Sequence, residues 1–419
     1  MKHPWFFLLF FVSPLLIAQD APLTIERAVQ LAVERNERAA IADTDVEAAE
    51  ARLRRGRSAF FPRIDVAGNW RADYEQGTDR TLQTSALLTQ PLFDARLFPI
   101  YRQLRFEREA TRLSAHDTRR VLAFDAAITF LTTISLEQVL LAAENRRRFA
   151  QTNLDDVRAR FEAGLVSSND VTRAELELAN AVRGVAQAAG DVQASRINLE
   201  TLLKTDVDGP LATPAGLLDA ADEPPAATDA EIDAAQQRRS DIGATRARVE
   251  ALRAFAQEPA ARFIPSVLLN AQTRNVNDGP IANRNNEGFV GVTVNWPLLD
   301  AGVRSSERAE RNALVRGAEL ELEADLREVE QQMRGSAVQL ATEQALLREA
   351  TAALRAARKN ADETSALYRE GLASALELAD ANQRRFEAEV AEVTARYRMA
   401  VAYLALREAA GVGAVGENR

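Results

Sequence analysis

The sequence predicts an α+β membrane protein that combines long coiled-coil helices with four transmembrane β-strands per chain. Three observations point to this fold class. The chain is internally duplicated, and each half holds a helical stretch of roughly 60 residues without proline. Each half also holds two alternating apolar and polar segments whose length suits a membrane-crossing strand.

Composition and charge exclude several other classes. The chain has 47% hydrophobic and 27% charged residues, which fits neither a polytopic helical membrane protein nor a disordered chain. The net charge of −9 argues against nucleic-acid binding, because phosphate contacts need a basic surface. Cysteine is absent and the two histidines are His3 and His116, so no metal site or cofactor is expected. No phosphate-binding loop, dinucleotide fingerprint or nucleophile elbow occurs, and the sequence therefore does not predict an enzyme.

The first element is a short export signal. Lys2 and His3 form a polar start, residues 6–17 form an apolar run, and Ala18 precedes polar residues. This order is typical of a secretory signal peptide cut near Ala18. A transmembrane anchor is the alternative, but a spanning helix needs about 20 apolar residues. We expect residues 1–18 to be a signal peptide of an envelope or secreted protein.

Three sequence landmarks recur in the same order at an offset of about 203–207 residues. The pairs are Phe60-Phe61-Pro62 with Phe263-Ile264-Pro265, Pro91-Leu92-Phe93-Asp94 with Pro297-Leu298-Leu299-Asp300, and Phe161-Glu162-Ala163-Gly164-Leu165 with Tyr368-Arg369-Glu370-Gly371-Leu372. Such ordered matches indicate a duplication. The predicted repeats span residues 19–205 and 229–410. The proline-rich segment 206–228 is expected to be a linker or small non-helical element, and residues 411–419 a C-terminal tail.

Each half predicts the same order of elements: a helix, two paired strands, a very long helix, a tight turn and a second long helix. The very long helix runs from about Tyr101 to Phe161 in the first half and from about Val303 to Tyr368 in the second. At 1.5 Å per residue such a helix is roughly 100 Å long. An ordinary globular core does not hold a helix of that length.

Apolar residues recur every seven positions along the long helices. The sets are Val171, Leu178, Val185, Val192 and Leu199; Leu326, Met333, Leu340, Leu347 and Leu354; and Leu376, Val390, Tyr397 and Leu404. Strict sevens predict left-handed coiled-coil packing. The first set is accompanied by small residues, namely Ala174, Ala181, Ala188 and Ser195, which allow close approach of helices. The helices alone are equally compatible with a soluble coiled coil.

The strand segments favour a membrane protein over that alternative. In the first half, Ile64, Val66, Gly68, Trp70, Ala72 and Tyr74 alternate with Asp65, Ala67, Asn69, Arg71, Asp73 and Glu75. A strand of roughly 11 residues with one apolar and one polar face matches a tilted outer-membrane strand. We expect Val66 to face hydrocarbon and Asp65, Arg71 and Asp73 to face the lumen. The return strand is expected over residues 82–90.

The second half repeats this pattern over residues 266–274 and 289–296. In the return strand, Val290, Val292, Val294 and Trp296 share one face, so Val292 is expected to face lipid. Polar turns are expected at residues 76–79 and, at greater length, 277–287. The aromatic residues near the strand ends suit an interfacial girdle, and they are Trp70, Tyr74, Phe93, Phe289 and Trp296. A hairpin packed on a soluble core is the alternative, but it explains less well why both duplicated hairpins have spanning length.

Four strands leave open sheet edges, which lipid cannot satisfy. Unpaired backbone N–H and C=O groups are costly in hydrocarbon, so spanning strands must close into a barrel. Closure needs at least eight strands, and therefore at least two copies of the chain.

These residues resemble the TolC family of bacterial outer-membrane efflux proteins over nearly the whole mature chain. The resemblance rests on the duplicated halves, the strand entries at Phe61-Pro62 and Ile264-Pro265, the strand exits at Asp94 and Asp300, and the two helical tips. Family members often carry an acylated N-terminal cysteine, and this chain departs from that subset because it has no cysteine.

The resemblance implies a homotrimer in the outer membrane that extends into the periplasm. Three chains would form a barrel of twelve strands and a tunnel of twelve helices, with a belt from the chain ends and the linker. The implied function is the passive exit duct of a tripartite efflux or type I secretion system. The implied partners are a periplasmic adaptor of the membrane fusion protein class, an inner-membrane transporter of the RND, ABC or MFS type, and outer-membrane lipid. The competing class is a periplasmic coiled-coil adaptor or structural envelope protein.

The resemblance also implies a gate at the periplasmic mouth that involves Asp170 and Tyr368. In the family pattern an arginine stands two residues after the second tip glycine and pairs with the aspartate of the first tip. In this chain that position is Ala373. Arg369 and Arg173 are the candidates for its replacement.

Glu377 and Asp380 lie three positions apart on a helix, so their carboxylates share a face. The resemblance places them in the narrow mouth, where three copies would bring six acids together and attract cations. A solvated helix face is the alternative interpretation. The tips themselves are the expected adaptor-docking surface, formed by Ala163, Gly164 and Leu165 in the first repeat and by Glu370, Gly371 and Leu372 in the second.

Overall fold

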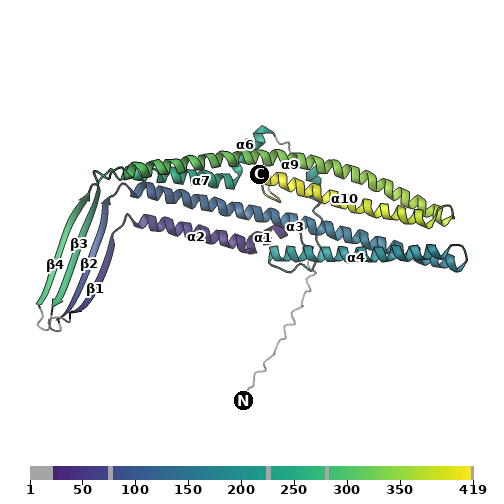
Figure 1. Ribbon diagram of the computed structural model, residues 1–419, viewed down its shortest axis with the longest axis horizontal. Helices are drawn as coiled ribbons and strands as arrows, with labels where there is room; N and C mark the ends of the chain where they lie inside the picture. The colour runs from purple at the N-terminus through teal and green to yellow at the C-terminus, as the bar shows by residue number, and fades with distance from the viewer. Residues whose placement is uncertain (1–21, 74–78, 223–227, 279–282, 417–419) are drawn as a thin grey trace, which may run out of the picture.

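The computed structural model describes residues 22–73, 79–222, 228–278 and 283–416 of the protein. The predicted signal peptide, residues 1–18, lies outside them. Figure 1 shows an elongated molecule built from a bundle of long helices. A four-stranded sheet lies at one end of the bundle, and the tight turns of two helical hairpins lie at the other. This arrangement confirms the predicted fold class at the level of a single chain.

The two halves contain the same succession of elements. The first half comprises α1 (Ile25–Arg35), α2 (Glu37–Ser58), β1 (Arg63–Asp73), β2 (Asp79–Phe93), α3 (Leu97–Glu162) and α4 (Ser168–Leu203). The second half comprises α6 (Asp229–Arg238), α7 (Ser240–Phe255), the single turn α8 (Glu258–Ala261), β3 (Ser266–Asp278), β4 (Asn283–Asn295), α9 (Val303–Arg369) and α10 (Ala375–Ala409). The two very long helices, α3 and α9, are thus confirmed within a few residues. Pro99 is tolerated in α3 because it lies in the first turn, where its missing N–H leaves no helical bond unmade.

The predicted non-helical linker contains a short helix, α5 (Ala215–Asp222). Pro214 stands just before it, and the Pro214 carbonyl accepts from the amide of Leu217 at 3.1 Å. The sequence interpretation gave weight to the prolines and missed that a proline at a helix start is compatible with helix formation. Upstream of α5, Leu211 forms a parallel bridge with Leu23, so the linker lies against the segment that precedes α1.

The sheet has the order β1-β2-β3-β4 and is antiparallel throughout. Its register puts Val66 opposite Ala86, Leu88 opposite Ala271, and Leu269 opposite Val292. Because alternate residues share a face, these pairs form one continuous apolar surface across all four strands. Large side chains on it stand exposed, and they include Ile64, Val66, Trp70, Val290, Val292 and Val294. Asp65 and Arg71 occupy the opposite face, as predicted, whereas the side chain of Asp73 and the whole of Tyr74 lie outside the described residues.

Two details of the strands differ from the prediction. Phe289 pairs with Gln272 and lies on the polar face, so it does not belong to the predicted girdle on the apolar face. The turn predicted over residues 277–287 is shorter, because β3 continues to Asp278 and β4 begins at Asn283. Polar side chains also bond across this extension of the ladder, since the side-chain amide of Asn275 donates to the side-chain oxygen of Asn286. Composition alone therefore does not mark the end of an outer-membrane strand.

The heptad pattern describes the helix packing, with one exception. In α4 the small companions Ala174, Ala181 and Ala188 are the more deeply buried set, which brings α3 close to α4. Leu376 was expected in the seam of α10, but it is 58% exposed. It lies in the first turn of α10, where it lines a gap together with Leu176 of α4 and is not packed in the seam between helices.

The main core lies midway along the bundle, where the two halves meet. It gathers Phe124, Phe130 and Leu131 of α3 with Leu199 of α4 and Leu404 of α10. The same stretch makes α3 long and apolar enough, by composition, to cross a membrane. Burial in this core accounts for its apolar character.

Candidate functional site at the helical tips

The α3–α4 and α9–α10 hairpins end in the same tight turn. Gly164 and Gly371 both adopt φ +75°, a conformation that residues with a Cβ rarely accept. The next residue closes the helix end, since the Leu165 amide donates to Arg160 O and the Leu372 amide donates to Leu367 O, each at 2.8 Å. This is the bond pattern of a glycine-terminated helix, and it gives the two tips one geometry.

A reciprocal cap starts the return helix at each tip. The Asp170 carboxylate accepts from the backbone amide and the hydroxyl of Ser167 at 3.0 and 2.8 Å. The Glu377 carboxylate accepts from the same two groups of Ser374 at 2.6 and 2.9 Å. Each serine hydroxyl accepts in turn from the amide three residues on. These hydrogen bonds keep the pKa of both carboxyls below their usual values.

The capping geometry changes the role expected for the predicted gate acids. Asp170 and Glu377 are equivalent positions of the two repeats, and each fixes its own turn. Asp380 lies on the surface of α10 and forms an ion pair with Arg384 at 2.9 Å. The sequence contains the signal for both caps, a serine followed three residues later by an acid. From the sequence, these acids were interpreted only as charges at a channel mouth.

Tyr368 joins the two hairpins at the tip. Its ring is buried with Leu154 and Val157 of α3. The Arg160 guanidinium of α3 lies 4.7 Å from the ring centroid, and its Nη1 donates to Tyr368 O at 3.2 Å. Burial raises the pKa of the Tyr368 hydroxyl, which has no hydrogen-bond partner among the described residues.

Arg160, which the sequence analysis did not single out, is therefore the arginine that contacts the tyrosine. Arg369 instead places its Nε near Ser365 O at 3.4 Å on the exposed side of α9. Arg173 is exposed on α4, where its charge helps to lower the pKa of Asp170. The Arg160 contact joins helices more than 200 positions apart, so local spacing gives no signal for it.

At each tip one leucine side chain projects from the bundle into solvent. Leu165 is 74% exposed and Leu372 is 76% exposed. The flanking predicted residues, Ala163, Gly164, Glu370 and Gly371, are exposed too. Each rigid turn therefore presents one large apolar side chain to solvent.

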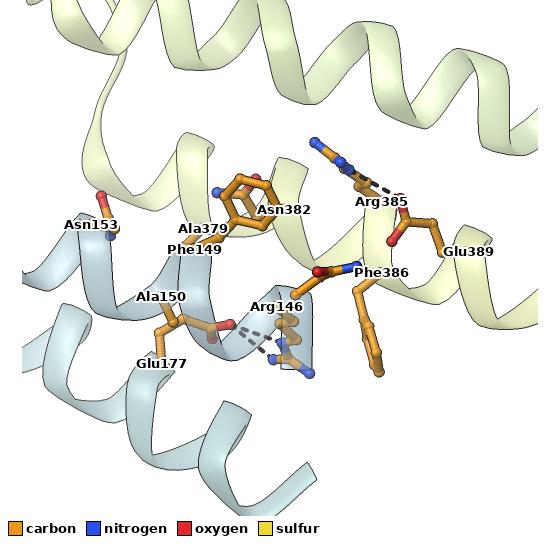
Figure 2. A pocket seen from close by; sticks show the side chains of 11 residues that line it. Arg146, Phe149, Ala150, Asn153, Glu177, Ala379, Asn382, Arg385, Phe386 and Glu389 are labelled. Carbon is orange, nitrogen blue, oxygen red and sulfur yellow. Dashed lines mark hydrogen bonds and ion pairs between the residues drawn. The ribbon is translucent and has the colours of Figure 1, made fainter. Parts of the chain in front are cut away.

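A second contact between the hairpins lies deeper, along α3 and α10. Figure 2 shows the crevice there, with side chains from α3, α4 and α10 around it. The Arg146 guanidinium lies 4.9 Å from the Phe386 ring, and the Arg385 guanidinium lies 5.0 Å from the Phe149 ring. Each arginine also pairs with an acid, Arg146 with Glu177 at 2.9 Å and Arg385 with Glu389 at 3.2 Å. Both arginines thus cross from one hairpin to the other.

Comparison with protein families matches most of the chain. The family described as outer membrane efflux protein matches residues 28–204 and 232–412. Alkaline protease secretion protein AprF of Pseudomonas aeruginosa is 25% identical over 425 residues, covering 95% of this chain and 86% of that protein. Toluene efflux pump outer membrane protein TtgC of Pseudomonas putida is 25% identical over 300 residues, covering 66% of this chain and 60% of that protein.

Solved structures share the fold. The channel CusC superimposes with a TM-score of 0.81 at 18% identity, covering 93% of this chain and 92% of that one. The open state of the outer membrane channel MtrE of Neisseria gonorrhoeae gives a TM-score of 0.80 at 17% identity, with coverage of 93% and 89%. VceC of Vibrio cholerae gives a TM-score of 0.76 at 17% identity, with coverage of 93% and 96%.

Proposed function

The chain belongs to the outer membrane efflux protein family, and on this premise we propose that it is the passive exit duct of a tripartite efflux or type I secretion system. The observation that carries the proposal is the sheet. Its apolar face carries exposed large side chains on β1 and β4 and mostly half-buried ones on β2 and β3, and its other face is mainly polar. A helical bundle roughly 100 Å long continues from its end. Such a chain can cross the outer membrane and reach far into the periplasm.

The duct closes as a homotrimer in this proposal. β1 and β4 are the outer strands of the sheet, so each chain leaves two edges to be paired in lipid. Two chains would close eight strands and three would close twelve. The family resemblance favours three.

The duplication supports closure through neighbouring chains in the helical region as well. Within the chain, α7 packs against both α9 of its own repeat and α3 of the other repeat. Its repeat equivalent α2 packs mainly against α3 of its own repeat. The partner that α2 lacks is, by this equivalence, the α9 helix of an adjacent copy.

The helical tips provide the gate and the docking surface in this proposal. Asp170 and Glu377 hold the turns, Tyr368 holds the two hairpins together, and Asp380 adds charge at the mouth. The exposed leucines Leu165 and Leu372 present the surface for a periplasmic adaptor, which connects the duct to an inner-membrane transporter of the RND, ABC or MFS type. The named relatives comprise a protease secretion protein and a toluene efflux pump protein, and the proposed duct suits either system.

Native mass spectrometry and planar-bilayer recording of the detergent-extracted protein test this function together. We expect a mass of three chains and a conducting pore that needs no energy source. Recovery in the soluble periplasm without detergent, or a single-chain mass without conductance, would overturn the proposal and favour a periplasmic adaptor or structural protein.

A further inference from the structure

We propose that the arginine-rich end of α2 binds anionic phospholipid headgroups in the periplasmic leaflet of the outer membrane. The basic segment comprises residues 52–63, immediately before β1. It contains five arginines and no acid, although the whole chain carries a net charge of −9. The inference goes beyond the duct function, because it assigns a lipid class to one surface of the protein.

Most of these arginines have no internal anion. Arg52, Arg55 and Arg57 are exposed, and none has a carboxylate within salt-bridge distance among the described residues. Arg54 has only a long contact of 3.8 Å with Glu50, and Arg63 pairs with Asp65 at 2.6 Å. Three guanidinium groups are therefore free to bind an external anion.

At the equivalent place in the second repeat, the arginines are neutralised by an acid of the same chain. There Glu258 is buried between Arg262 and Arg311, with N–O distances of 2.7 and 2.8 Å. The offset that aligns Phe60 with Phe263 aligns Arg55 with Glu258. The first repeat thus has an arginine where the second has the neutralising acid.

The basic segment lies immediately before β1, and this position favours a lipid headgroup as the bound anion. Arg55 and Arg57 lie within about 5 Å of the end of α2 along the helix axis, inside a headgroup layer that is roughly 5–8 Å thick. Arg52 lies about 9 Å from that end, and its long side chain can extend to the layer. Phe61 and Phe98, each 55% exposed, mark the interface next to it. Phe60 anchors this corner by edge contacts with the rings of Phe98 and Tyr101, at centroid distances of 5.6 and 6.0 Å.

Arginine suits this ligand, because its planar guanidinium binds phosphate oxygens in pairs while its aliphatic stem stays on apolar surface. Each arginine near an anionic membrane surface strengthens binding by about fivefold. In the proposed trimer the α9 helix of an adjacent copy lies along one side of α2, so a carboxylate of that copy is the competing anion for these arginines.

The test is native mass spectrometry of the full-length assembly in detergent, titrated with phosphatidylglycerol or with phosphatidylcholine. We expect the wild type to retain phosphatidylglycerol preferentially, with weaker retention at high salt. The triple variant Arg52→Gln/Arg55→Gln/Arg57→Gln should lose affinity for phosphatidylglycerol by fivefold or more and keep its affinity for phosphatidylcholine. The corresponding lysine variant should retain most of the preference, because it keeps the charge.

A matched control is the triple variant Arg147→Gln/Arg348→Gln/Arg355→Gln, which removes three exposed arginines that lie far along α3 and α9 from the strands. It should leave lipid affinity unchanged. Two outcomes would overturn the proposal. One is equal loss in both triple variants, and the other is dissociation of the assembly in the first variant while the lipid preference of the remaining oligomer is unchanged. The duct function would survive either result, since it is measured separately by conductance.

Discussion

The guanidinium of Arg160 lies 4.7 Å from the ring centroid of Tyr368 and donates to its backbone carbonyl at 3.2 Å. This pair joins α3 to α9 at the end of the bundle, beyond the contacts between α3 and α10. Any motion that separates the two hairpins of one chain must break it. If the tips form the proposed gate, the pair should therefore resist their opening.

Arg160→Ala should weaken the closed tip and increase leak current in a planar bilayer. A partly buried cation–π contact contributes about 1 kcal/mol, so the closed state should lose roughly fivefold in population. Arg158→Ala is the matched control, because Arg158 pairs with Glu175 inside one hairpin. Tyr368→Phe should leave the leak unchanged, since the hydroxyl has no partner among the described residues. A similar leak in the two arginine variants would rule out the proposed role of Arg160.

If the proposed trimer places Glu377 and Asp380 at its mouth, the open channel should prefer cations. Six carboxylates in a narrow opening create a larger potential than the same charges in bulk water, and divalent cations should bridge them and block current. Glu377→Gln/Asp380→Asn should reduce the cation preference and relieve the block. Arg384→Gln should do the reverse, because it removes the cation paired with Asp380 at 2.9 Å. Single-channel reversal potentials measure both effects, and an unchanged double variant would place the selectivity elsewhere.

The register of β4 predicts a strong difference between adjacent substitutions. Val292 lies on the exposed apolar face, and Thr293 lies on the other face, where its hydroxyl accepts from Asn270 at 3.0 Å. An arginine facing lipid costs about 2–4 kcal/mol near the midplane and less toward the interfaces. Val292→Arg should therefore reduce the amount of oligomer recovered from the membrane fraction, measured by native mass spectrometry, far more than Thr293→Arg. Equal tolerance of the two would show that the faces are assigned wrongly.

Acid should loosen the tips through their caps. Asp170 and Glu377 have lowered pKa values in the folded protein, so their stabilisation is present above the unfolded values near 4 and is lost as pH falls through the folded values. Hydrogen exchange at the starts of α4 and α10, corrected for its intrinsic pH dependence, should therefore accelerate below about pH 4. The start of α1 is the internal control, because the hydroxyl of its cap residue Thr24 accepts the Arg27 amide without a carboxylate. Acid sensitivity that persists in Asp170→Asn/Glu377→Gln would assign the effect to other groups.

Glycine substitutions should have opposite signs at two positions. Gly371→Ala should destabilise the α9–α10 tip by about 1 kcal/mol or more, because φ is +75° there. Gly184→Ala should stabilise α4 by about 0.5–1 kcal/mol, because that glycine is helical and a Cβ would meet open space. Thermal unfolding followed by circular dichroism compares the two variants. A loss of stability in Gly184→Ala would contradict the assignment of free space beside α4.

The sequence predicted the features that repeat along one element. The seven-residue spacing of Val192 and Leu199 and the alternation around Val66 both survive in the structure, because period alone decides which face is apolar. The two glycine turns were also predictable, because each depends on a glycine at one position and not on a contact with a distant segment. Contacts between distant segments were not predictable, and the approach of Arg160 to Tyr368 is the clearest example, since nothing within either helix requires it.

The Leu88–Ala271 pair of the β2–β3 ladder joins residues about 180 positions apart in the sequence. Such a ladder has a high contact order, and its loop-closure cost must be met before its hydrogen bonds contribute. The two hairpins β1–β2 and β3–β4 can form locally, while their union waits until the intervening helices have brought them together. We therefore expect the sheet to be completed late in folding, and until then no single apolar surface spans all four strands.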